Sequence, residues 1–148
     1  MSPPRPVVVI AVGNPSRGDD AIGPLLAARL EALDLPGVEV ITDFQLAPEH
    51  ALDLAGREKV IFVDAGEGTT APFELRRIAA RDDRSYTSHA MSPAAVLAAY
   101  ERAVGGAPPE AWVLCVAGAN FELGEPPSPA AAAGMEAAWP ALRAALGR

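Results

Sequence analysis

The sequence predicts one α/β domain over residues 1–148, folded as a three-layer α/β/α sandwich around a mostly parallel sheet of about five strands. Three observations predict this fold. The run from Val7 to Val12 is continuously apolar and rich in β-branched residues, as expected for a central strand covered on both faces. A helical pattern follows it, and strand and helix patterns then alternate along the chain. No linker or internal repeat divides the chain into separate domains.

Each element has a local pattern that predicts it. Apolar residues recur at three- and four-residue spacing from Ile22 to Leu33, which predicts a helix, and Pro24 suits its first turn. Gly56 suits the end of a short second helix, because glycine adopts the left-handed conformation common at helix ends. In order, the predicted elements are strand 7–12, helix 22–33, strand 38–42, helix 48–55, strand 59–64, edge strand 73–78, helix 92–104, strand 112–116 and helix 128–146.

The composition excludes several classes of function. The longest apolar run is far shorter than the roughly 20 residues that span a bilayer, and the N-terminal segment lacks the apolar region of a signal peptide. We therefore expect a cytoplasmic protein that does not associate with a membrane. The net charge of −7 disfavours binding to nucleic-acid phosphates. A single cysteine, Cys115, excludes an intramolecular disulfide and a zinc site of several thiolates.

The ends of the predicted strands indicate where a ligand would bind. In open α/β sheets, ligands bind at the carboxyl ends of the strands. Three segments lie at such ends, namely residues 13–20, 64–68 and 118–125. The candidate functional residues are therefore expected in these segments.

The segment after the first strand has the glycine spacing of a phosphate-binding loop, with Gly13 and Gly18 in place. Asp19 stands where that motif has lysine, and Asp20 stands where it has a hydroxyl residue. Two carboxylates disfavour a bound phosphate. A nucleotide-binding α/β domain stays a lesser alternative, because Asp43, at the end of the second strand, stands where a ligand to an NAD ribose lies in such domains.

The acidic pair at Asp19 and Asp20 exceeds what a helix start requires. One aspartate is expected to cap the following helix through its side chain. The other carboxylate is then free, and a cluster of oxygen ligands beside a strand end suits a cation. The sequence thus favours a cation at this loop over a phosphate.

Several motifs recur in a defined order. Gly13-Asn14, the acidic pair and Gly23 follow the first strand, and residues 44–49, 60–65 and 88–93 come later. In these segments the chain resembles the hydrogenase maturation protease family over nearly its whole length. The resemblance implies an endopeptidase that removes the C-terminal extension of the precursor large subunit of a nickel–iron hydrogenase after nickel insertion. A metal-sensing chaperone or scaffold that recognises the precursor without cutting it is the alternative.

The resemblance also implies the site residues. Asp20, Asp64 and His89 fall on the positions of the family's metal-binding and catalytic set, although Asp20 is one methylene shorter than the glutamate of many members. The recognised metal is nickel carried by the substrate, no organic cofactor is implied, and the attacking group stays open. If the resemblance is set aside, the residues alone favour a helix-capping or solvent-facing role for His89. They likewise favour a turn formed by Asp64 and Gly66. The residues implied to bind the substrate are Gly13, Asn14, Asp19 and Gln45.

Three further features have simpler interpretations. Cys115 lies within an apolar strand, where burial is expected to raise the pKa of its thiol and favour core packing over catalysis. His50, beside Glu49 on the short second helix, is expected at the surface or in the binding cleft, without a catalytic role. Ser88 adjoins His89, but the chain has no G-x-S-x-G motif that would support a serine mechanism.

Residues 118–122 depart from the Pro-Glu pattern of many relatives, and the role of that loop stays open.

Overall fold

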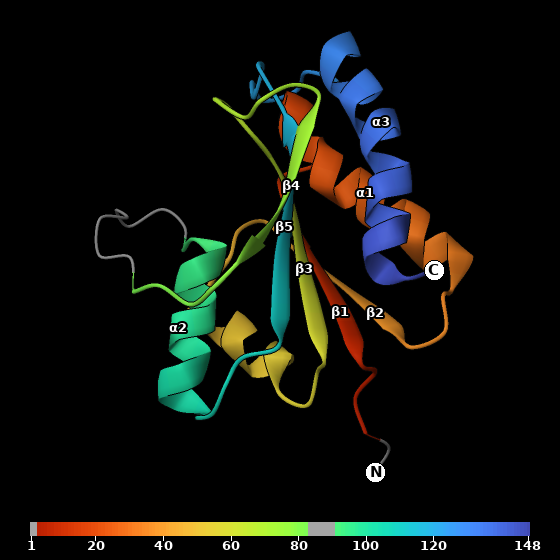
Figure 1. Ribbon diagram of the computed structural model, residues 1–148. Helices are drawn as coiled ribbons and strands as arrows, with labels where there is room; N and C mark the ends of the chain where they lie inside the picture. The colour runs from red at the N-terminus through yellow and green to blue at the C-terminus, as the bar shows by residue number, and fades with distance from the viewer. Residues whose placement is uncertain (1–2, 83–90) are drawn as a thin grey trace.

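The computed structural model describes residues 3–82 and 91–148 of the chain (Figure 1). Strands and helices occur in the alternating order that the sequence predicts. The 3₁₀ helices are labelled η. In order, the elements are β1 (Val7–Val12), η1 (Gly18–Ala21), α1 (Ile22–Leu33), β2 (Val38–Asp43), η2 (Pro48–Leu54), β3 (Lys59–Gly66), β4 (Phe73–Ile78), α2 (Pro93–Ala103), β5 (Glu110–Ala117) and α3 (Pro129–Leu146).

The strands form one mixed sheet in the order β2-β1-β3-β5-β4. The first four strands in that order run parallel, and β4 pairs antiparallel with β5 at the edge. Helices α1 and α3 cover one face of the sheet, and α2 and η2 lie on the other face (Figure 1). The three-layer α/β/α sandwich with a mostly parallel sheet is therefore confirmed.

The core is divided by the sheet into two clusters. Residues of β1 alternate between them, because successive side chains of a strand point to opposite faces. Val9 packs with α1 and α3, whereas Val8 and Ile10 pack with α2 and η2. All six residues of β1 are buried, which explains its continuously apolar sequence.

Two serines begin the later helices. The Ser92 side chain accepts a hydrogen bond from the Ala95 amide at the start of α2, and Ser128 accepts one from Ala131 at the start of α3. Three predictions need correction in detail: the second helix is a 3₁₀ helix, β3 extends two residues beyond Asp64 to Gly66, and β5 begins two residues before the predicted strand 112–116 and ends one residue after it. Over the described parts of the chain, no helix is long and apolar enough to cross a membrane.

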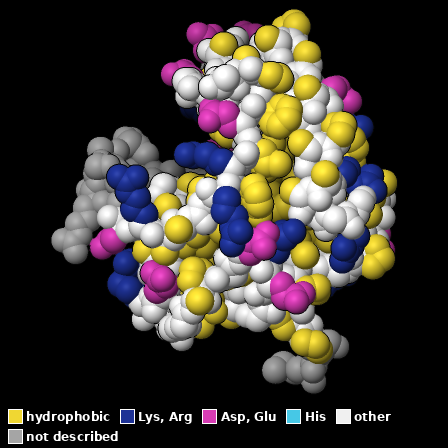
Figure 2. Space-filling view, in the orientation of Figure 1, with side chains coloured by type: hydrophobic (Ala, Val, Ile, Leu, Met, Phe, Trp, Pro, Cys, Tyr) yellow, Lys and Arg dark blue, Asp and Glu magenta, His cyan; other side chains and the backbone are white. Residues whose placement is uncertain are grey.

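Hydrophobic side chains reach the surface on the face of the molecule viewed in Figure 1. Figure 2 shows them gathered there beside Lys and Arg side chains, over the side of the sheet formed by β4 and β5. Two arginines, Arg76 and Arg77, belong to β4. Because they pair with Val113 and Trp112, the edge strand places positive charge beside the first half of β5.

Candidate active site

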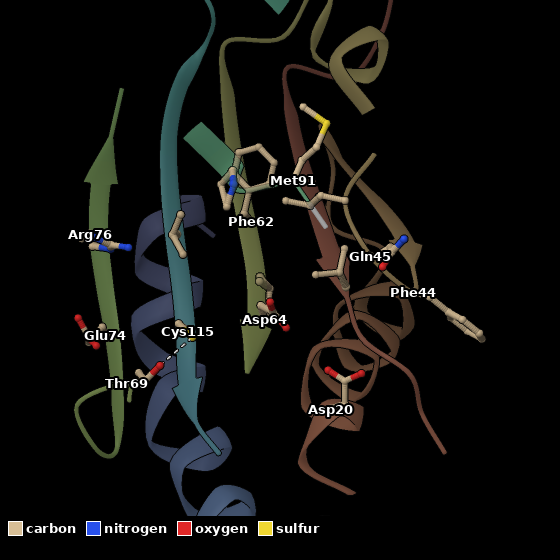
Figure 3. Close-up of a pocket in the computed structure, with 15 residues that line it drawn as sticks. Asp20, Phe44, Gln45, Phe62, Asp64, Thr69, Glu74, Arg76, Met91 and Cys115 are labelled. Carbon is tan, nitrogen blue, oxygen red and sulfur yellow. Dashed lines mark hydrogen bonds between the residues drawn. The ribbon is translucent and has the colours of Figure 1, made fainter. Parts of the chain in front are cut away.

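A pocket of about 380 Å³ opens at the carboxyl ends of β1 and β3 (Figure 3). Its apolar wall consists mainly of side chains from the sheet and from the segments before η2 and α2, namely Leu46, Phe62, Met91 and Val113. Asp20 and Asp64 lie at its acidic side, while Glu74 and Arg76 of β4 border it on the opposite side. The pocket thus lies where the strand-end rule predicts a ligand.

Two glycines allow the loop that carries Asp20 to approach β1 closely. A Cβ atom on Gly13, whose φ is 146°, would lie 2.0 Å from the Asp20 carbonyl oxygen. A Cβ atom on Gly23 would lie 2.3 Å from the Val12 carbonyl oxygen. Neither contact is possible for a larger residue without movement of the backbone. The predicted Gly13 therefore acts through the backbone, by letting the acidic loop fold back onto the strand end.

Asp20 is the carboxylate of the acidic pair that faces the pocket. Its Oδ2 accepts a hydrogen bond of 2.7 Å from the Asn14 amide, which fixes the side chain at the pocket's edge. The Asn14 side chain is itself engaged, because its Oδ1 accepts a bond of 2.8 Å from the Ser16 amide. Asn14 thus holds the loop and Asp20, and the free oxygen of Asp20 remains open to a ligand.

Asp19 has a different position from the one expected, because its side chain is completely buried. It neither caps the following helix nor reaches the surface where a substrate would bind. Its Oδ1 accepts from the Ser128 amide at 2.6 Å. Its Oδ2 accepts from the amides of Ala119 and Asn120 and from the Ser128 hydroxyl. Asp19 therefore fastens the segment between β5 and α3 to η1.

The pKa of Asp19 reflects these bonds. Burial alone would raise it, because burial disfavours a charged carboxylate. The hydrogen bonds from Ala119, Ser128 and Asn120 together outweigh burial and hold the pKa below its ordinary value. Asp19 is consequently an ionised structural group at neutral pH.

Asp64 is the second acidic residue of the pocket, and it lies near the carboxyl end of β3. Its Oδ1 accepts a hydrogen bond of 2.7 Å from the adjacent Ala65 amide. Burial raises the pKa of Asp64 to about 7, the bond from Ala65 opposes that rise, and the negative charge of Asp20 adds to it. The two predicted carboxylates, Asp20 and Asp64, are therefore close enough to influence each other.

The third predicted member of the set, His89, lies outside the described residues. Within residues 3–82 and 91–148, no three His, Cys, Asp or Glu side chains are grouped closely enough to hold a metal ion. The structure thus brings together Asp20 and Asp64 of the predicted set. Metal binding by all three residues stays a prediction.

Two residues of the pocket wall carry more polar chemistry than the sequence suggested. Cys115 packs against the core as predicted, but it also borders the pocket, with its Sγ 3.1 Å from the Thr69 hydroxyl. Burial raises the pKa of its thiol, as expected, and the bond to Thr69 opposes the rise. Asp64 and Cys115 are register partners on β3 and β5, so strand pairing places them together. Sequence alone did not reveal this pairing.

The segment after β2 forms the remaining wall, and Gln45 lines the pocket there together with Phe44 and Leu46. His50 follows on η2 and is only 3% exposed, so of the two places expected for it, the surface and the binding cleft, the surface is wrong. Its ring contacts Ala47 and Asp43, which enclose the wall-forming segment. A histidine beside Glu49 gives no sequence signal of such burial.

Comparisons with known proteins identify similar structures. No protein-family model matches the sequence, and no curated protein matches it. The hydrogenase maturating endopeptidase HybD from Escherichia coli has 26% sequence identity and a TM-score of 0.71, with 95% of this chain and 91% of that chain covered. The [NiFe] hydrogenase maturation protease HycI from Thermococcus kodakarensis has 21% identity and a TM-score of 0.74, with 97% and 94% covered.

A third structure, the hydrogenase 2 maturation peptidase from a Thaumarchaeota archaeon, has 24% identity and a TM-score of 0.69, with 95% and 97% covered. The last two likenesses concern the fold, whereas the match to the Escherichia coli endopeptidase also extends to sequence over nearly all of both chains. The predicted motifs and the pocket at the strand ends agree with it. The similarity to this endopeptidase, at 26% identity over nearly all of both chains, therefore supports the hydrogenase maturation protease family that the motifs predict, and it supports a protease.

Proposed function

We propose that this endopeptidase acts in the cytoplasm and removes the C-terminal extension from the precursor large subunit of a nickel–iron hydrogenase after nickel insertion. The observation that carries the proposal is the convergence of Asp20 and Asp64 on one pocket. They come from different strand ends, and burial, with a smaller contribution from the charge of Asp20, raises the pKa of Asp64. The similarity to hydrogenase maturation endopeptidases supplies the kind of substrate.

Nickel borne by the precursor would be recognised by Asp20, Asp64 and His89. Two carboxylates and an imidazole form a mixed oxygen and nitrogen set that suits a borderline divalent ion. The electrostatics of the described pair support this role. Two carboxylates that repel each other, one of them largely buried, are stabilised in their ionised forms by a nearby cation. Met91, two positions after His89 in the chain, lines the same pocket.

The chemistry of bond cleavage would then use the precursor's own metal. A divalent ion polarises a carbonyl group or a bound water, so hydrolysis does not require a nucleophilic side chain of the protease. In the described part of the chain, no serine, threonine or cysteine forms a hydrogen bond with a histidine. The raised pKa of Cys115 also disfavours a reactive thiolate.

The proposal is tested by incubating the purified protein with nickel-loaded and nickel-free precursor and measuring the intact mass of each product. We expect loss of a discrete C-terminal peptide from the loaded precursor alone. Equal loss of the peptide from both forms would support the peptidase activity but would show that the protease does not recognise nickel. Binding without any loss would favour the chaperone alternative.

The nucleotide-binding alternative is tested by thermal unfolding with ATP or NAD. A ligand that binds the folded state raises the melting temperature. We expect no rise, because Asp20 occupies the place where a phosphate would be bound and carries negative charge. A reproducible rise at millimolar nucleotide would contradict the proposed function.

A further inference from the structure

The segment between β2 and η2, residues 43–47, forms a ridge beside the pocket. Phe44, Gln45 and Leu46 all line the pocket. Phe44 also lines a second hollow with Pro15, Pro24 and other small residues. Its side chain is 66% exposed and points away from Asp64 in Figure 3. The segment thus separates two hollows and presents an aromatic ring to solvent between them.

Within the described residues, Phe44 belongs to neither of the two core clusters. Leu46, two residues later, is buried in the core cluster and anchors the segment from below. The second hollow is mainly apolar, and Glu31 and Asp43 add negative charge to its lining. Such a surface is complementary to an apolar peptide segment that also carries basic residues.

His50 holds both ends of this ridge. Its Nδ1 accepts a hydrogen bond of 2.9 Å from the Ala47 amide, while the His50 amide donates one of 3.0 Å to the Ala47 carbonyl. Its Nε2 lies 3.3 Å from Asp43 Oδ2. A ring that accepts at Nδ1 carries its proton at Nε2, the nitrogen that faces the Asp43 carboxylate. One buried side chain thus joins the first and last residues of the ridge.

We propose that His50 is a positioning residue, which fixes residues 43–47 so that Phe44 anchors the precursor on the ridge between the two hollows. The inference rests on the proposed function for the identity of the bound protein. The occupant is a segment of the precursor with an apolar side chain against Phe44 and basic residues near Glu31 and Asp43. His50 acts through the ridge and does not touch the reacting bond.

The clamp is tested first without any substrate, by hydrogen exchange of the backbone amides in residues 43–49. His50→Ala removes the acceptor of the Ala47 amide, so exchange there should become about tenfold faster, as the loss of one buried hydrogen bond predicts. His50→Asn should restore most of the protection, because the asparagine Oδ1 can occupy the position of Nδ1.

Leu54→Ala is the matched control for the clamp. Leu54 lies on the same 3₁₀ helix and is fully buried, but it packs in the core cluster. This variant should destabilise the protein without a selective change at Ala47. Unchanged exchange at Ala47 in His50→Ala, or an equal change in Leu54→Ala, would overturn the clamp.

The role of the ridge is tested by cleavage kinetics of the nickel-loaded precursor. Phe44→Ala should raise KM about tenfold with little change in kcat, as expected for an apolar anchor at the pocket's edge whose ring points away from Asp64. His50→Ala should raise KM similarly. In the His50→Ala background, a further Phe44→Ala change should alter KM less than about twofold, because the ring is no longer held in place.

Additive effects of the two substitutions on KM would overturn the positioning role, and an unchanged KM in Phe44→Ala would overturn the anchor. A wild-type protein that cleaves no precursor would instead refute the proposed function. The exchange experiment separates these failures, since it requires no precursor and measures the clamp alone.

Discussion

Two aspartates close to the carboxyl edge of the sheet have opposite surroundings. Asp19, in the region between η1 and the start of α3, receives hydrogen bonds from three backbone amides and one hydroxyl. Asp64, in the pocket, receives one bond from the adjacent Ala65 amide and faces the charge of Asp20. The pKa of Asp19 is lowered, whereas burial raises that of Asp64 to about 7.

The difference shows that burial alone does not identify a functional carboxylate. Burial favours the neutral form of both groups, and the number of donors decides the outcome. A carboxylate that is fully hydrogen-bonded stabilises the fold and has no capacity left for a ligand. A carboxylate with few donors and a like-charged neighbour is costly to ionise, and a cation relieves that cost. We therefore expect the pocket region to bind a ligand, whereas the hydrogen bonds of Asp19 stabilise the fold.

The largest effect is expected for Asp64→Asn on cleavage. Replacing the carboxylate by an amide removes a charge that the metal-assisted reaction uses, while the side-chain shape is kept. We expect cleavage of nickel-loaded precursor to fall about 100-fold or more, within the range usual for catalytic groups. Intact mass spectrometry of the product over time measures it.

Asp34→Asn is the control for this change. It makes the same substitution at the C-terminal end of α1, where Asp34 has a φ of 45°, a conformation that asparagine also tolerates. Its activity should equal that of the wild type. Normal cleavage by Asp64→Asn would refute the assigned role of Asp64.

The next largest effect concerns stability and compares the two members of the acidic pair. Asp19→Ala leaves buried donors of Ala119, Asn120 and Ser128 without an acceptor, and we expect it to lower the free energy of unfolding by about 3 kcal/mol or more. Asp20→Ala removes one bond from the partly buried Asn14 amide, so about 1 kcal/mol is expected. Urea unfolding measures both. Equal decreases in the free energy of unfolding for Asp19→Ala and Asp20→Ala would contradict a structural role for Asp19 and a ligand-binding role for Asp20.

A smaller effect is expected in the pH dependence of stability of the metal-free protein. Because the pKa of Asp64 is raised from 3.8 to about 7 on folding, the folded state binds more protons between these values. The stabilisation from protonated Asp64 is fully present below pH 3.8 and is lost as pH rises through about 7. Asp64→Asn should therefore be more stable than wild type at pH 8 by about 4 kcal/mol, because each unit of pKa shift corresponds to about 1.4 kcal/mol.

The same comparison at pH 5 should show a smaller difference, because at pH 5 Asp64 is ionised in the unfolded protein but is still largely protonated in the folded wild type, and the two stabilities should converge only below pH 3.8. Asp19 shifts in the opposite direction and is ionised at both pH values, so it cancels from the comparison. A stability difference that is the same at pH 5 and pH 8 would show that the pKa of Asp64 is not raised.

The sequence allowed the order of strands and helices to be predicted, because that order depends on local patterns. The predicted β1 and β4 have the observed bounds, and Ser92 and Ser128 precede α2 and α3 as helix starts. The pairing of an acidic loop with the end of β3 also followed, since parallel strands bring their carboxyl ends to one edge.

The roles of individual residues depended on distant contacts and could not be predicted. Asp19 and Asp20 are adjacent and alike, and the donors that bury Asp19 lie 100 residues or more away in the chain. His50 is buried by the fold of the segment before it, and the residues adjacent to His50 in the sequence do not predict this burial. The proximity of Cys115 to Asp64 required the register of β3 and β5.

The smallest effect on cleavage is expected for substitution of Cys115. Because Cys115 lines the same pocket as Asp64, it tests whether a polar group of the pocket other than the carboxylates is needed. Burial and the charge of Asp64 raise the pKa of its thiol, so little thiolate exists at neutral pH. Cys115→Ala should cleave the precursor within about twofold of the wild type, since metal-assisted hydrolysis uses no thiol. Alkylation by iodoacetamide at pH 7 should also be slower than that of free cysteine. A loss of activity in Cys115→Ala as large as in Asp64→Asn would identify this thiol as the attacking group, which the proposal leaves open.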